Sequence, residues 1–400
     1  MSAVGVVLSG GGARGAYEAG VLSYVFGDLA RAHPISRLAL VSGSSVGAIN
    51  GAFLAAMAGD PAAGIASLEQ TWANLELPHV LRFGVRQATE LHRVLLGGNK
   101  ASGLFDARPL ARVVGQQIPW KLLRRNIRSG VLRAFIVSAT DVSTGRPTIF
   151  VDRAPGVRVP GGLAPMARVR RERIGPHHVL ASAAIPIIFP PVQVGPNLYC
   201  DGGLRLNTPM APAIHLGVRK LFVVGVSSPI HSTHLPALGP GRFPGASFLL
   251  GKIMNAFLLD HLNSDLDELA RINNYIEDGC AVYGKDFIER INQESAKRGE
   301  PARQIVRALA VRPTVDLGRV ASEHLRRNRA RFGRVLGRAF LRLLDVGEGA
   351  DADLASYLLF DGDFARRLMD LGRADARALA PEILEFLTPA PSEASIIPDS

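Results

Sequence analysis

Residues 4–20 read VGVVLSGGGARGAYEAG, so a short apolar run enters a glycine-rich loop and leaves it as a helix-like segment. The apolar run, Val4–Gly10, is typical of a buried strand, and Ala16–Ala30 is expected to be a helix. Backbone N–H groups at the start of such a helix stabilise negative charge. The loop is therefore expected to hold either the permanent charge of a phosphate or a charge that exists only in a transition state.

The same alternation of apolar runs and helix-like segments continues through the first half of the chain. A second strand is expected within residues 38–47, which lead into a helix at 48–58, and further strands at 132–142, 148–152 and 220–228. Strands with near-continuous Val, Ile and Leu that alternate with helices indicate a mostly parallel sheet covered on both faces. The predicted fold class is α/β, with three layers.

The character of the sequence changes after Ser228. A segment rich in Pro, Gly and His leads into long helical patterns that begin at Phe248 and continue towards the end of the chain. Four hundred residues also exceed what one compact core usually holds. We therefore expect an α/β domain at 1–228 and a mainly helical region at 229–400 that packs on it or extends it.

Composition limits the class of protein and its surroundings. The chain is 47% hydrophobic and 20% charged, which is sufficient for a large core. Cys200 and Cys280 cannot form a disulfide framework, and we find neither a secretory signal nor an uninterrupted apolar span of about 18 residues. These features predict a cytoplasmic protein. The net charge of +11 predicts attraction to an anionic partner, either nucleic acid or a membrane surface.

Nucleotide binding is one interpretation of the glycine loop. Gly10, Gly12 and Gly15 have the spacing of a dinucleotide fingerprint, but that fold needs a carboxylate at the end of the second strand. Here the second strand ends in Ser42–Ser45. A phosphate loop would need Gly-Lys-Ser or Gly-Lys-Thr, which Arg14-Gly15-Ala16 does not supply. Both nucleotide interpretations are disfavoured.

The second strand ends instead in Gly43-Ser44-Ser45-Val46-Gly47, a G-x-S-x-G pattern at a strand-to-helix turn. Such a turn strains the central serine and exposes its hydroxyl, while the glycines remove side chains that would clash. Neighbouring strand–loop–helix units would place the first glycine loop beside Ser45. Amides near Gly11 and Gly12 are then expected to hold the oxyanion that forms when Ser45 attacks an acyl carbonyl.

A nucleophilic serine needs a base. None of the ten histidines lies next to a motif at a strand end, so each is interpreted as a surface or core residue. Asp201 follows a short apolar run in NLYCDGGLRLNTP, and a carboxylate there could accept the Ser45 proton directly, although Asp-Gly-Gly is most often only a turn. Cys200 is interpreted as a buried structural thiol. Side chains alternate between the two faces of a strand, so the Cys200 side chain is expected on the face opposite that of Asp201.

Three motifs in this order resemble the patatin-like phospholipase family: Gly-Gly-Gly-Ala-Arg-Gly at 10–15, Gly-Ser-Ser-Val-Gly at 43–47 and Asp-Gly-Gly at 201–203. ASAAIPIIFPP before the aspartate and SATDVSTGRPTIF at 138–150 are similar to bacterial members. The similarity covers at least residues 4–228, and RPTVDLG and SYLLFD extend it towards the C-terminus.

The resemblance implies a patatin-type α/β core with a helical C-terminal extension and hydrolysis of lipid acyl esters, with no metal and no cofactor. It implies that Ser45 is the nucleophile and Asp201 the base of a Ser-Asp dyad. The other implied site residues are the oxyanion hole Gly10, Gly11, Gly12, Ala13, Arg14 and Gly15, the elbow glycines Gly43 and Gly47, and the Asp-Gly-Gly glycines Gly202 and Gly203.

Two other functions remain open at this point. An acyltransferase would pass the acyl group from Ser45 to an alcohol or thiol in place of water. A membrane-binding or regulatory protein would keep the pocket without turnover.

An arginine-rich segment, residues 325–344, contains no acidic residue. On a helix its arginines fall within roughly 80° of one another, with apolar residues on the far side. The arginines of this stripe are Arg327, Arg331, Arg334, Arg338 and Arg342. Either they are solvated or paired with acidic residues, or they dock the protein peripherally on anionic lipid. Nucleic acid is not expected as a partner, because no aromatic residues interleave with the stripe to stack on bases.

Overall fold

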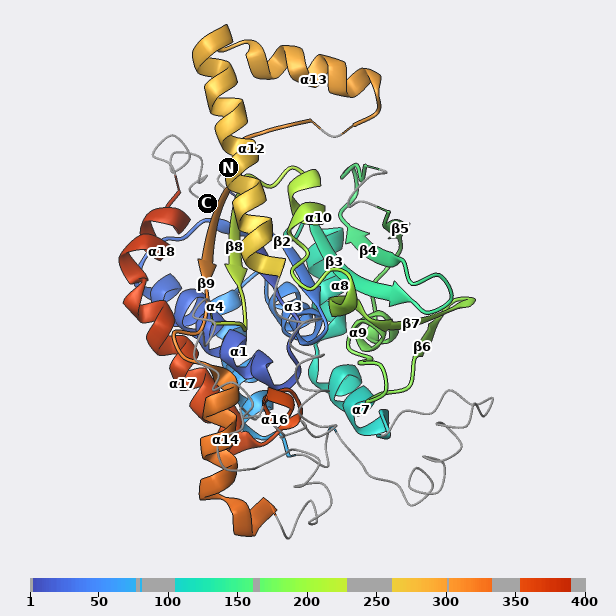
Figure 1. The fold of residues 1–400 in the computed structure, drawn as a ribbon, viewed down its shortest axis with the longest axis vertical. Coiled ribbons are helices and arrows are strands. Elements are labelled where there is room, and N and C mark those ends of the chain that lie inside the picture. The colour runs from blue at the N-terminus through green and yellow to red at the C-terminus, as the bar shows by residue number, and fades with distance from the viewer. Residues whose placement is uncertain are drawn as a thin grey trace, which may run out of the picture.

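Among the residues that the structure describes, nine strands form one sheet through the centre of the molecule (Figure 1). The computed structural model describes residues 3–76, 80, 105–160, 166–228, 261–300, 302–332 and 353–389. The strands are β1 (Ala3–Leu8), β2 (Arg37–Ser44), β3 (Ala134–Asp141), β4 (Pro147–Arg153), β5 (Arg168–Arg171), β6 (Val192–Val194), β7 (Asn197–Asp201), β8 (Lys220–Val224) and β9 (Arg307–Val311).

The sheet is mostly parallel, as the sequence predicts. Its order is β5-β4-β3-β2-β1-β8-β9, and the run from β3 to β9 is parallel throughout. Strand β4 is antiparallel to β3. Strands β6 and β7 form a hairpin, and β7 pairs with β3 in the antiparallel direction. The carboxyl ends of β1, β2, β3 and β8 therefore lie along one edge, where open α/β sheets bind their ligands.

Helices flank the sheet. They are α1 (Gly15–Ser23), α2 (Ala30–Ala32), α3 (Val46–Ala56), α4 (Pro61–Ala73), α7 (Arg108–Gln117), α8 (Trp120–Arg128), α9 (Pro176–Ser182), α10 (Met210–His215), α12 (His261–Tyr283), α13 (Phe287–Lys297), α14 (Leu317–Arg327), α16 (Asp353–Leu358), α17 (Gly362–Ala378) and α18 (Ala380–Leu387). A π-helical turn, Tyr24–Leu29, joins α1 to α2, so the helix expected at 16–30 is present with one widened turn.

Alternate side chains of the central strands enter two separate cores. Val6 and Leu8 of β1 belong to the core on the side of α1, α3 and α17, whereas Val7 packs with residues of α10 and α12 on the opposite face. Since successive strand residues point to opposite faces, this partition follows directly from the apolar run that opens the chain. The three-layer α/β fold is confirmed.

The C-terminal part adds more than helices to this core. Residues 307–311 form β9, which pairs in parallel with β8 and extends the sheet. No strand was expected there, because RALAV is short and is followed by helical patterns. The segment 229–260, which includes the expected linker, lies outside the described residues, and the division at residue 228 stays a prediction.

Helices α1 and α17 lie in backbone contact through two glycines. A Cβ atom on Gly20 of α1 would overlap the Met369 carbonyl oxygen, and one on Gly372 of α17 would overlap the Tyr17 carbonyl oxygen. The Tyr17 hydroxyl donates to Asp375 Oδ2 at 3.0 Å across the same interface. This close packing fixes α17 on the helix that follows the first glycine loop.

We predict that Gly372→Ala destabilises the protein by about 1–3 kcal/mol, because the added methyl group meets backbone that cannot move aside. Gly115→Ala in α7 is the matched control: nothing lies within 4 Å of its Cβ position, so alanine should be neutral or slightly stabilising. Urea unfolding of both variants measures the difference. Equal stabilities would contradict the close contact of α1 and α17.

Candidate active site

Ser45 occupies a strained turn between β2 and α3. Its φ of 53° and ψ of −126° are unusual for a residue other than glycine, and its amide donates to Ser182 Oγ at 2.8 Å. Side chains at the flanking glycines are excluded: a Cβ on Gly43 would overlap the Gly47 carbonyl oxygen, and one on Gly47 would overlap the Leu8 carbonyl oxygen. These contacts explain the spacing of the G-x-S-x-G pattern.

The register of β3 places Asp201 beside this turn. Ser138 of β3 pairs with Ser44 at the end of β2, and the next residue, Ala139, pairs with Asp201 of β7. Strand β7 thus continues the line of β2 after β2 has ended. Gly202 lies so close to β3 that a Cβ there would overlap the Ser138 carbonyl oxygen.

The two side chains meet in a short hydrogen bond. Ser45 Oγ donates to Asp201 Oδ2 at 2.6 Å, and Gly203 donates its N–H to the other carboxylate oxygen at 2.7 Å. The turn was expected to expose the Ser45 hydroxyl, but Ser45 is only 2% exposed, because its hydroxyl is bonded to the fully buried Asp201. Burial raises the pKa of Asp201 to about 7, although the hydrogen bonds from Ser45 and Gly203 act in the opposite direction. The carboxyl group is therefore able to bind and release a proton near neutral pH.

The Gly10–Gly15 loop begins beside Ser45, since a Cβ on Gly10 would lie 3.0 Å from Ser45 Cβ. The Gly10 N–H donates to the Asn207 side chain at 3.0 Å and also to the Asn207 carbonyl, while the Arg14 and Gly15 amides donate within the loop. Among the described residues, no acceptor is found for the amides of Gly11, Gly12 and Ala13. They are the donors that could meet an oxyanion at Ser45.

The side chain of Arg14 does not point to the reacting pair. Its Nε donates to Ser356 Oγ of α16 at 2.7 Å, and its guanidinium carbon lies 4.2 Å from the centre of the Tyr357 ring. The sequence motif groups Arg14 with the oxyanion hole; the structure gives its side chain contacts with the C-terminal region.

Neither Cys200, the alternative nucleophile, nor a described histidine, the alternative base, takes part in this pair. Burial raises the pKa of the Cys200 thiol to about 11, which disfavours the reactive thiolate. His324 lies near Asp361, and His178 packs against Phe150; no described histidine is hydrogen-bonded to Ser45 or Asp201. Within the part of the chain that the structure describes, no group of three His, Cys, Asp or Glu side chains is placed to hold a metal ion.

Two supporting residues were not predicted from the sequence. Ser182, at the end of α9, accepts a hydrogen bond from the Ser45 amide, and the Asn207 side chain accepts one from the Gly10 amide. Asn207 follows the Asp-Gly-Gly motif by four residues, so its place in the same loop was the only available signal. Ser182 lies in an apolar, alanine-rich segment with no pattern that marks it.

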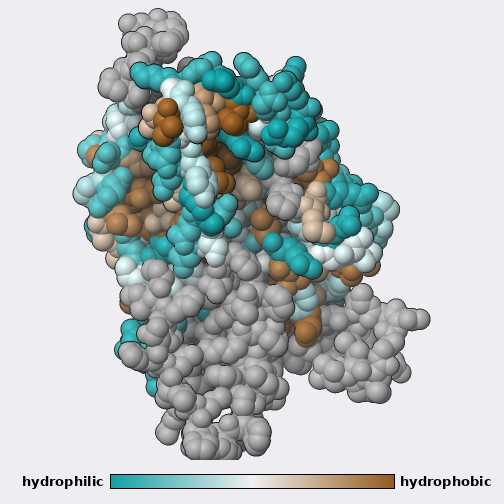
Figure 2. All heavy atoms as spheres, turned by 45° about the horizontal axis from the view of Figure 1, so that its top comes forward, coloured by the Kyte–Doolittle hydropathy of each residue, from teal (hydrophilic) through white to brown (hydrophobic). Residues whose placement is uncertain are grey.

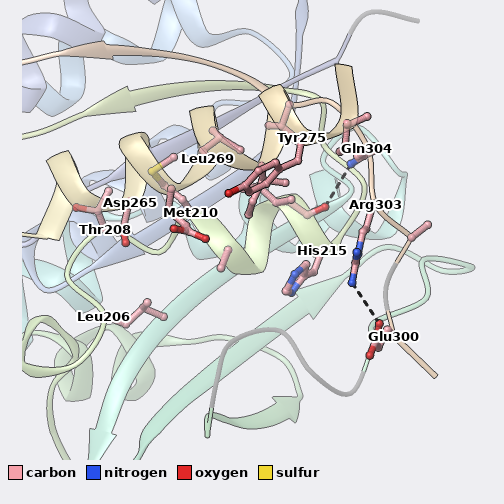
Figure 3. A pocket seen from close by; sticks show the side chains of 17 residues that line it. Leu206, Thr208, Met210, His215, Asp265, Leu269, Tyr275, Glu300, Arg303 and Gln304 are labelled. Carbon is pink, nitrogen blue, oxygen red and sulfur yellow. Dashed lines mark hydrogen bonds and ion pairs between the residues drawn. The ribbon is translucent and has the colours of Figure 1, made fainter. Parts of the chain in front are cut away.

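A cavity of about 670 Å³ lies between α10 and α12 (Figure 3). Among the described residues that line it are Leu206 and Thr208, which flank Asn207, but neither Ser45 nor Asp201 is among them. In Figure 2, brown hydrophobic patches interrupt a mostly hydrophilic face. Tyr275, at 68% exposed, is one of the exposed hydrophobic residues of α12.

The arginine stripe is described only in part. Arg331 forms ion pairs with Asp361 and Asp363, both at 2.7 Å, which fits the paired interpretation for this residue. Arg334, Arg338 and Arg342 lie outside the described residues. No described helix has the length and apolar character needed to cross a membrane.

We predict that Asp201→Asn becomes more stable relative to wild type as pH rises from about 5 to about 8.5. The raised pKa means that the folded state favours the protonated carboxyl, so wild-type stabilisation by that proton is lost as pH passes about 7. Asparagine removes the buried charge and keeps the shape. Thermal melts at both pH values measure the difference.

Asp141→Asn is the control of opposite sign. Burial alone would raise the pKa of Asp141, but hydrogen bonds from Thr144 and Asn197 lower it. Its ionised form stabilises the fold above the unfolded-state pKa, and Asp141→Asn should therefore lose stability at neutral and high pH. If the two variants respond to pH in the same way, the buried Asp201 charge is not the source of the effect.

Two of the solved structures to which this chain is similar share little sequence identity with it. The crystal structure of VipD from Legionella pneumophila aligns with 92% of this chain and 67% of its own, at 12% identity and a TM-score of 0.31. Human GIVD cytosolic phospholipase A2, in complex with methyl gamma-linolenyl fluorophosphonate, aligns with 56% of this chain and 39% of its own, at 18% identity and a TM-score of 0.29. No curated protein matches the chain significantly.

The family model for patatin-like phospholipases matches residues 6–214, more than half of the 400 residues. That range contains Ser45, Asp201 and the first glycine loop. The resemblance inferred from the motifs is confirmed, and the chain belongs to the patatin-like phospholipase family.

Proposed function

We propose that the protein hydrolyses acyl esters of lipids, with Ser45 as nucleophile and Asp201 as its only base. The observation that carries this proposal is the 2.6 Å hydrogen bond between the Ser45 hydroxyl and the buried Asp201 carboxylate. Membership of a phospholipase family supports a lipid acyl ester as the substrate. The site needs no cofactor for this reaction.

In the first step Asp201 accepts the hydroxyl proton while Ser45 Oγ attacks the acyl carbonyl carbon. Negative charge develops on the carbonyl oxygen, and the amides of Gly11 and Gly12 are proposed to bind it. One such donor typically lowers the barrier by roughly 3 kcal/mol. The N-terminus of α3, which begins at Val46, adds a favourable potential at the same place.

Collapse of the tetrahedral intermediate breaks the ester bond. Asp201 passes its proton to the leaving alkoxide, and the acyl group remains on Ser45. A water molecule then gives a proton to Asp201 and attacks the acyl carbon, and the proton returns to Ser45 as the fatty acid leaves. A pKa of about 7 suits a group that must both take and give a proton near neutral pH.

We further propose a location, a membrane contact and a domain division for this protein from its sequence. The net charge of +11 supports peripheral contact with anionic membranes. The low cysteine content supports a cytoplasmic location. The change of composition after Ser228 supports a catalytic domain at 1–228 and a C-terminal region at 229–400.

Ser45→Ala should lower phospholipid hydrolysis at least about 1,000-fold and abolish labelling by a fluorophosphonate probe, because both need the same nucleophile. Ser44→Ala is the matched control: Ser44 is equally buried, and its hydroxyl has no hydrogen-bond partner among the described residues. It should keep most of the activity. The measurements are release of fatty acid from phospholipid vesicles and in-gel fluorescence.

Retained hydrolysis in Ser45→Ala, with the fold intact by circular dichroism, would contradict the proposed function. A second outcome would also count against hydrolysis of lipid esters: wild type is labelled and Ser45→Ala is not, but wild type releases no fatty acid. Ser45 would then be a reactive serine without this activity.

A further inference from the structure

We propose that Ser356 and Tyr357 are positioning residues for the oxyanion loop and act through Arg14 and Gly12. This inference rests on the proposed function of the loop. The two residues lie more than 100 positions beyond the region matched by the family model, which ends at residue 214. The C-terminal region would then be part of the catalytic apparatus.

The first observation is the place of the Arg14 side chain. It is only 3% exposed, although it belongs to a loop that is proposed to bind a negative charge at Ser45. Its Nε donates to the fully buried Ser356 hydroxyl at 2.7 Å, and its guanidinium lies over the fully buried Tyr357 ring. A cation–π contact is stronger when both groups are removed from water, as they are here. Arg14 thus ties the loop to α16.

The second observation concerns Gly12, one of the two proposed oxyanion donors. Its φ is +57°, and the space that a Cβ would fill is occupied by the Tyr357 backbone carbonyl. The Cα atom of Gly12, which is bonded to the proposed donor nitrogen, therefore lies directly against the backbone of α16. Any shift of Tyr357 must move this peptide or open a gap beside it.

The third observation is that contacts with α14 and with the start of α17 fix the position of α16. It packs against α14 and continues through a tight turn to Asp361. Asp361 lies 3.2 Å from His324 of α14, pairs with Arg331 at 2.7 Å, and accepts the Phe364 N–H at the start of α17. Since α17 is in backbone contact with α1, the loop and the helix after it are both fixed by residues 353–378.

These contacts matter because the direction of an oxyanion donor decides its effect. A donor stabilises the transition state only when it points at the position that the charged oxygen will occupy. Misplacement by about 1 Å, caused by a change distant from the reacting atoms, can lower a rate about 100-fold. Loss of the contacts that Ser356 and Tyr357 make with the Gly10–Gly15 loop should therefore lower kcat more than it changes KM.

The test measures kcat, KM and the rate of fluorophosphonate labelling of Ser45 in the full chain, each corrected for the folded fraction. Ser356→Ala and Arg14→Met should each lower kcat and the labelling rate about 10- to 100-fold, with KM changed less than about threefold. Ser322→Ala is the matched control, a buried serine of α14 that is hydrogen-bonded to neither Arg14 nor Ser45 among the described residues. It should keep wild-type kcat.

The double variant Arg14→Met/Ser356→Ala separates a shared pathway from two independent effects. If Ser356 acts through Arg14, removing its hydroxyl in the Arg14→Met background has no further effect on kcat. Tyr357→Leu should lower kcat in the same range, and Tyr357→Phe, which keeps the ring, should restore most of it.

Wild-type kcat in Ser356→Ala, or a double variant whose loss is the product of the single losses, would overturn the proposal. So would variants that lose only thermal stability and keep kcat per folded molecule. Failure of the proposed function is visible separately, because in that case wild type itself would release no fatty acid and Ser45 would not be labelled.

Discussion

The hydrogen bond between Ser45 and Asp201 joins two side chains that are 156 positions apart and almost inaccessible to water. Its geometry depends on the whole sheet. Strand β2 delivers the serine on a strained turn, and β7 delivers the carboxylate by pairing with β3 just beyond the end of β2. Glycines at 43, 47 and 202 allow the backbones to approach closely enough for this bond to form.

Placing a carboxylate there carries a free-energy cost. A buried charge is disfavoured, and the raised pKa of Asp201 expresses that cost, since the folded protein holds a proton that the unfolded chain would release near pH 4. The same burial makes the carboxylate a stronger base, which is useful for taking a proton from a hydroxyl. Stability and basicity are therefore opposed at this residue, as is common where function needs a strained or desolvated group.

The sequence predicted those features that depend on local pattern. Apolar runs between helices indicated the parallel sheet, and the glycine spacings singled out Ser45 and its turn, because backbone approach demands glycine at fixed offsets. Asp201 was a candidate base from its place after an apolar run, but only the family resemblance assigned it that role, since a short Asp-Gly-Gly loop has many structural uses. Strand β9, Ser182 and the contacts of Ser356 could not be predicted. They depend on tertiary pairing, and a lone serine or a five-residue run carries no periodic signal of its partner.

We propose that Ser45 attacks an acyl carbon whose oxygen is held by Gly11 and Gly12. The most direct measurement is a crystal structure of the protein after reaction with a fluorophosphonate, whose phosphorus replaces the acyl carbon of the tetrahedral intermediate. On this proposal, phosphorus is bonded to Ser45 Oγ, and a phosphonyl oxygen lies about 2.7–3.1 Å from the Gly11 and Gly12 amide nitrogens. An adduct on another residue, or a phosphonyl oxygen that points away from this loop, would contradict it.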